Sequence, residues 1–126
     1  MLLIYQDEKA LTEADRTACY EESTRLTHRL RANGQYLAAS PLQPTGTATS
    51  VRVRGGRPVV TDGPFAETRE QLGGYYLIDA KDLDEAISIA TQVPMARRGT
   101  VEIRPLVELT DLPEPNPSAR AEADRP

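Results

Sequence analysis

The segment GGYYLIDAKDLDEAISIATQVP, residues 73–94, joins a strand pattern directly to a helix pattern. Tyr75–Asp79 is a nearly continuous apolar run, which predicts a central strand that is covered on both faces. Asp82 with Glu85 three residues later predicts a helix N-terminus with a capping box, and Pro94 predicts where the helix stops. The predicted apolar face of this helix holds Leu83, Ala86, Ile87 and Ala90. A strand followed by a covering helix predicts a fold that combines α and β structure.

The chain before this segment repeats the order of strand and helix. Residues 2–6 are apolar and stop at charged residues, as a short buried strand does. Thr12–Asn33 contains neither Pro nor Gly, and it begins at an N-cap residue and ends at Asn33-Gly34, so it predicts a long helix. At about 100° per residue, His28 projects away from the packing stripe and is expected to face water. The predicted stripe holds Cys19, Ser23, Leu26 and Leu30.

Three further β segments follow from local patterns. Residues 35–42 predict a strand that Pro41 would end or confine to a sheet edge. Residues 51–54 and 57–61 flank Gly55-Gly56, which predicts a tight β-hairpin. The polar residues 65–71 are predicted to hold a single helical turn, and residues 100–109 predict a closing strand.

These elements together predict one ferredoxin-like α+β domain over residues 1–110. Two helices would cover one face of an antiparallel sheet that carries an inserted β-hairpin. The second face would be covered by another copy of the chain, so we expect a homodimer whose interface encloses a polar cavity for a small-molecule ligand. Residues 111–126 are rich in Pro, Glu and Asp and predict a disordered or extended C-terminal tail.

Composition and net charge limit the partners, cofactors and location that the sequence predicts. The chain has 126 residues and a formal net charge of −4 with a pI near 5.0, which argues against nucleic acid as a partner. The single cysteine, Cys19, excludes an internal disulfide, and with the single His28 it cannot build a zinc site. We therefore expect no metal and no cofactor. No apolar run approaches the ~20 residues of a membrane span and no export signal is seen, so the sequence predicts a cytoplasmic protein without a membrane partner.

Asp62 and Glu67 are the candidate catalytic residues. Asp62 ends a predicted strand beside the expected cavity, and Glu67 follows five residues later. Burial or a neighbouring carboxylate would raise the pKa of one of them and suit it to acid–base work. The structural alternative is that Asp62 caps the turn it forms with Gly63 and Pro64. Both interpretations stay open.

The candidate ligand-binding residues lie on the closing strand and around the central strand. Glu102 and Arg104 share one strand face, where they would form either an anion site or a salt-bridged dimer surface. Tyr75 and Tyr76 point to opposite faces, so one belongs to the core and the other is free to line the cavity. Phe65 begins the segment that borders the same cavity. Asp62, Glu67, Arg104 and one of Tyr75 or Tyr76 are expected to border a single pocket between the sheet and the segment that follows Phe65.

The stretch Val60–Tyr76, VTDGPFAETREQLGGYY, resembles the signature of the Asp-Gly-Pro-Phe branch of the YCII-related family. The flanks agree, because residues 1–5 resemble the first strand of the family and residues 99–105 its closing strand. The resemblance implies a ferredoxin-like fold of the dimeric α/β-barrel superfamily, with a small-molecule pocket in each protomer. It implies an enzyme with acid–base chemistry of the lyase, isomerase or dehalogenase kind. The alternative is a non-catalytic ligand-binding or regulatory dimer associated with transcription through sigma factors.

The chain departs from the wider family at one pair of positions. The resemblance assigns a His on the first helix and an Asp just before the Pro that follows the second helix. These positions hold Ser23 and Val93 in this sequence. A His–Asp pair is therefore not expected here, and acid–base chemistry would fall to Asp62, Glu67 and the closing strand.

Overall fold

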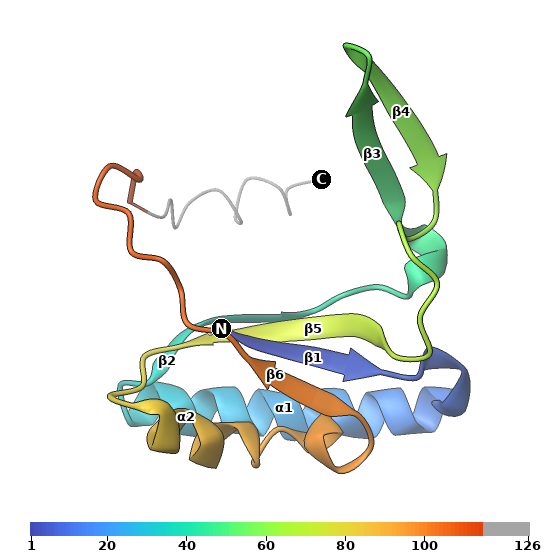
Figure 1. The fold of residues 1–126 in the computed structure, drawn as a ribbon. Helices are drawn as coiled ribbons and strands as arrows, with labels where there is room; N and C mark the ends of the chain where they lie inside the picture. The colour runs from blue at the N-terminus through green and yellow to red at the C-terminus, as the bar shows by residue number, and fades with distance from the viewer. Residues whose placement is uncertain (115–126) are drawn as a thin grey trace, which may run out of the picture.

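The computed structural model describes residues 1–114, which fold around one four-stranded antiparallel sheet (Figure 1). The strand order is β2-β5-β1-β6, so the first strand of the chain lies inside the sheet. The strands are β1 (Leu2–Gln6), β2 (Tyr36–Pro41), β5 (Gln71–Ile78) and β6 (Thr100–Ile103). The predicted α+β class with an antiparallel sheet is confirmed, and the sheet stays open within the described chain.

Two α-helices cover the same face of this sheet, α1 (Glu13–Ala32) and α2 (Leu83–Ala90) (Figure 1). Three short 3₁₀ turns connect the elements: η1 (Glu8–Ala10), η2 (Thr45–Thr47) and η3 (Pro94–Arg97). The predicted arrangement of two helices on one face is confirmed, and the opposite face carries no helix in the described residues.

The helix ends follow the signals in the sequence. Thr12 is the N-cap of α1, where its hydroxyl accepts from the Asp15 backbone N–H at 3.1 Å and its own N–H donates to the Asp15 carboxylate at 3.0 Å. Asp82 caps α2 by accepting from the Glu85 N–H at 2.8 Å. The predicted capping box of α2 is only half formed, because the Glu85 carboxylate accepts instead from the Lys81 N–H at 2.6 Å.

The core lies between the sheet and the helices. Its buried members are Leu2, Ile4, Leu26, Leu30, Tyr76, Ile89, Ala90, Val93 and Met95. The predicted apolar face of α2 was partly wrong, since Leu83 and Ile87 are 62% and 45% exposed while Ile89 is 2% exposed. The buried face contains Ala86, Ile89 and Ala90, so its centre lies away from Leu83 and Ile87, and Val93 beyond the helix end is buried as well.

The predicted hairpin forms a separate two-stranded sheet, β3 (Thr49–Arg54) and β4 (Arg57–Asp62). Gly55 and Gly56 have φ values of 56° and 74°, the left-handed conformation that a two-residue turn of this kind requires. The hairpin projects from the side of the main sheet that faces away from the helices (Figure 1).

Two predictions for the second half of the chain are wrong. The closing strand ends at Ile103 rather than at residue 109, because Pro105 has no N–H to continue the ladder. Residues 65–71 contain no helical turn, and β5 already begins at Gln71. The predicted tail starts at residue 111, and its residues 115–126 lie outside the described chain.

Candidate functional site

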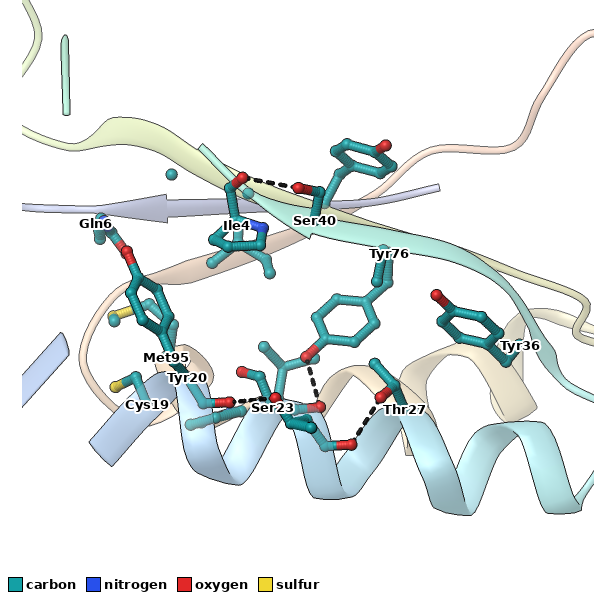
Figure 2. Close-up of a pocket in the computed structure, with 18 residues that line it drawn as sticks. Ile4, Gln6, Cys19, Tyr20, Ser23, Thr27, Tyr36, Ser40, Tyr76 and Met95 are labelled. Atoms are coloured by element: carbon teal, nitrogen blue, oxygen red, sulfur yellow. Dashed lines mark hydrogen bonds between the residues drawn. The ribbon is translucent and has the colours of Figure 1, made fainter. Parts of the chain in front are cut away.

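A pocket of about 250 Å³ lies between α1 and the sheet (Figure 2). Its walls come from α1, from the strands β1, β2 and β5, and from the segment Val93–Met95 after α2. Five separate parts of the chain therefore meet at this cavity, on the face of the sheet that the helices cover. Ligand sites are usually concave and largely pre-formed, so this cavity is the candidate site.

Short side chains account for the open space. The α1 residues Cys19, Ser23 and Thr27 recur every four positions and line the pocket from one side. On the same helix, the larger Leu26 and Leu30 are 0% and 2% exposed and belong to the core between the helix and the sheet. The smaller side chains do not span the gap between the helix and the sheet, so a cavity remains where they face the sheet.

Hydroxyl groups supply most of the polar atoms at the site. Tyr76 is 3% exposed, and its hydroxyl donates to the backbone carbonyl oxygen of Ser23 at 3.4 Å (Figure 2). The Thr27 hydroxyl donates to the carbonyl oxygen of Thr24 at 2.6 Å. The phenols of Tyr20 and Tyr36 also line the cavity. These groups can both donate and accept hydrogen bonds, so they would recognise a polar but uncharged ligand.

None of the eighteen residues that line the pocket is Asp, Glu, His, Lys or Arg. Two lining groups can ionise with a perturbed pKa. Burial raises the pKa of the Cys19 thiol, and burial raises the pKa of the Tyr76 phenol. Both groups are therefore protonated at neutral pH, and the pocket presents no ionised side chain from this pair.

The structure brings only two of the predicted site residues to this pocket, Tyr75 and Tyr76. They lie on opposite faces of β5, as predicted, and Tyr76 is the one in the core. Asp62 is exposed at the end of β4, where it pairs with Thr49 across the hairpin. Its assignment as a catalytic residue stays a prediction.

The remaining predicted residues also lie outside the pocket. Glu67 is exposed in the loop after β4, and Phe65 in the same loop is 78% exposed. Arg104 and Glu102 form an ion pair of 3.1 Å at the end of β6, where Arg104 is exposed. The expected pairing of these two side chains is present, whereas their proposed contact with a ligand stays a prediction. The seven predicted residues do not share one cavity.

The positions that the family resemblance singles out do meet at the pocket. Ser23 on α1 and Val93 after α2 both line it. They are 70 residues apart in the sequence and are brought together because both helices pack on the same sheet face. The family resemblance is the sequence signal that indicates this site, because it singles out the positions of both Ser23 and Val93.

No group of three or more His, Cys, Asp or Glu side chains within residues 1–114 is arranged to hold a metal ion. No helix in the same part of the chain combines the length and apolar character needed to cross a membrane.

Comparison with known proteins gives one family and one relative. The YCII-related domain matches residues 1–110. An uncharacterised protein of Rhizobium meliloti (strain 1021) is 39% identical over 114 residues, which cover 83% of this chain and 89% of the relative. The family match spans the sheet, both helices and the pocket. The chain therefore belongs to the YCII-related family.

Proposed function

We propose that this protein is a small-molecule-binding module whose pocket takes an uncharged ligand. The observation that carries the proposal is the lining, which contains hydroxyl, amide and apolar groups but no carboxylate, imidazole, ammonium or guanidinium group. A charged ligand would lose its hydration in this pocket without gaining an ionic partner, and that loss is costly. A neutral ligand with one or two hydrogen-bonding groups avoids this cost.

The size of the pocket limits the ligand further. An apolar cavity of about 150 Å³ is sufficient for benzene, whereas drug-sized ligands occupy about 300–1,000 Å³. A volume of about 250 Å³ suits a single substituted ring. The tyrosine side chains at the site would stack on such a ring and hydrogen-bond to its substituent.

The enzyme predicted from the sequence is the second candidate. An acid–base enzyme of lyase, isomerase or dehalogenase type needs a group that exchanges a proton near pH 7. The pocket offers Cys19 and Tyr76, whose raised pKa values keep them protonated. Asp62 and Glu67 are exposed and do not line it. These observations favour ligand binding over catalysis. They therefore also favour the alternative of a non-catalytic ligand-binding or regulatory dimer.

We also propose that the domain is ferredoxin-like and works as a homodimer. The strand order β2-β5-β1-β6, with a helix after the first and after the third strand of this sheet, supports the fold assignment. The sheet face without helices supports the dimer. By strand alternation it carries Leu3, Tyr5, Tyr75 and Leu77, apolar and aromatic side chains that a second sheet would cover.

A thermal-shift screen tests the binding proposal. Phenol and benzamide are neutral ring probes, and benzoate and benzylamine are charged rings of similar size. We expect the neutral probes to raise the melting temperature and the charged probes to leave it unchanged, because a ligand that binds only the folded state stabilises it. Preferential stabilisation by either charged ring would refute the proposed chemistry.

A matched pair of variants on α1 locates the effect. Ser23→Leu fills the pocket, whereas Thr17→Leu places the same side chain at an exposed position of the same helix. The stabilisation by neutral rings should disappear in the first variant and persist in the second. Equal responses of both variants would place the binding elsewhere. Asp62→Asn should leave binding unchanged, and a loss there would favour the enzyme candidate instead.

A further inference from the structure

The hairpin β3–β4 exposes an apolar stripe. Val51, Val53 and Val60 lie on one face of the hairpin and are 62%, 62% and 64% exposed. A two-stranded hairpin with no packing on either face is only marginally stable in water. The hairpin therefore needs a covering partner that the described chain does not supply.

The other face of the hairpin is strongly basic. Arg52 and Arg54 share it, and Arg57 lies directly opposite Arg54 across the two strands. Like charges at opposed positions are destabilising unless an acidic partner intervenes. The ion pairs within residues 1–114 involve Arg97, Arg98 and Arg104, and none includes an arginine of the hairpin.

A second unpartnered segment has the complementary character. Residues 105–112 follow β6, and their apolar side chains Leu106, Val107 and Leu109 are 57%, 81% and 60% exposed. Acidic Glu108 and Asp111 stand among them in the sequence, and both are exposed. The segment thus combines apolar side chains with negative charge, where the hairpin combines apolar side chains with positive charge.

Within one copy the two features do not meet. Both rise from the sheet side that faces away from the helices, but they do so at opposite ends of the sheet (Figure 1). A two-fold axis that lies between two facing sheets, perpendicular to the line that joins these two ends, exchanges the ends. It would bring each hairpin beside residues 105–112 of the other copy, and it would do so twice in the dimer.

We infer that residues 105–112 of each copy pack along the β3–β4 hairpin of a second copy. The segment runs along an edge of the hairpin, so that its apolar side chains reach the valine stripe on one face while Glu108 and Asp111 reach the arginines on the other. This inference rests on the homodimer proposed above. It adds a specific pair of surfaces to a dimer that would otherwise depend on the sheet face alone, and it explains why both surfaces are exposed in one copy.

Charge reversal tests the inference by sedimentation of the full chain. One variant carries Arg52→Glu with Arg54→Glu, and a second carries Glu108→Arg with Asp111→Arg. Each should raise the dimer dissociation constant about tenfold or more, because opposed charges at an interface then repel. The chain with all four changes should return to within about threefold of the wild type, since the attraction is restored with its sign exchanged.

A control separates local from overall charge effects. Arg29→Glu with Arg31→Glu, on the exposed side of α1, changes the net charge by the same amount as the hairpin variant and should leave the dissociation constant unchanged.

The possible outcomes distinguish a failure of the homodimer proposal from a failure of the proposed contact between the hairpin and residues 105–112. A monomeric wild type at micromolar concentration would refute the homodimer and this inference together. A dimeric wild type whose constant is unaffected by both reversals would overturn this inference alone and would leave the hairpin to another occupant, such as residues 115–126. Weakening by each reversal without rescue by the combination would also overturn it, because the two surfaces would then not face each other.

Discussion

Replacing Gly99 with alanine is expected to destabilise the fold strongly. Gly99 stands between η3 and β6, and its N–H donates to the Met95 carbonyl oxygen at 2.7 Å. A Cβ built at this position would lie 2.1 Å from the Tyr5 carbonyl oxygen and 3.4 Å from the Gln6 Cα. Both atoms belong to the backbone of β1, an inner strand, so no change of rotamer can relieve the contact.

The size of the effect follows from this geometry. Overpacking a well-packed site costs about 1–3 kcal/mol, and the upper end applies here because the obstacle is a strand and not a flexible side chain. We expect Gly99→Ala to lower the free energy of unfolding by about 3 kcal/mol. At roughly 4 °C per kcal/mol for a domain of this size, the melting temperature should fall by roughly 12 °C.

Gly46→Ala is the matched control. No atom lies within 4 Å of a Cβ built on Gly46. Both substitutions reduce the conformational freedom of the unfolded chain alike, so their difference isolates the clash in the folded state. Urea titration and thermal melting of both variants provide the comparison. If Gly99→Ala melted within about 2 °C of Gly46→Ala, the close approach of Gly99 to β1 would be refuted.

Three further predictions follow from single contacts. The hydrogen bond from Arg98 holds the pKa of Asp15 at about 2, below its ordinary value of 3.8. The stability that the Asp15 carboxylate contributes is therefore complete above about pH 4 and is lost as the pH falls through about 2. In urea titrations from pH 2 to 6, the free energy of unfolding should fall less steeply with acid in Asp15→Asn than in the wild type. Leu26→Ala should cost about 2–5 kcal/mol in chemical denaturation because Leu26 is 0% exposed, whereas Leu37→Ala at 58% exposure should change stability by less than about 1 kcal/mol, and similar losses in both would contradict the described core. Glu8→Ala should speed amide exchange in η2, since the Glu8 carboxylate accepts from the first N–H of η2 at 2.9 Å and from the same residue's hydroxyl at 2.8 Å, and unchanged exchange would show that the contact is not stabilising.

The sequence predicted the elements best where local chemistry is decisive. Thr12 and Asn33 bound α1 because their side chains or backbone satisfy the free groups at the helix ends. Gly55-Gly56 specified the hairpin turn because few other residues adopt the required φ. The predictions were weaker where packing decides, as on α2, where the predicted face included the exposed Leu83 and Ile87 and omitted the buried Ile89.

The candidate site shows the same division. Asp62 and Glu67 stand out in the sequence because carboxylates in a recognisable motif suggest chemistry, yet the structure leaves both exposed. Tyr76 was identified, whereas Thr27 and Tyr36 were missed because single hydroxyl residues carry no pattern of their own. Ser23 and Val93 were marked by the family resemblance, and only the packing of both helices on one sheet face joins them.

Caps, strand alternation and turn residues act over a few neighbouring positions, so they were enough to predict the α+β class, the order of the main elements and the hairpin turn, while the stretch Val60–Tyr76 indicated the family. The cavity between α1 and the sheet, with no Asp, Glu, His, Lys or Arg in its lining, results from tertiary packing alone. A cavity depends on how far short side chains from five separate segments reach toward one another. That distance is set by the packing of the larger residues around them, such as Leu26 and Leu30, and by nothing local to the segments themselves.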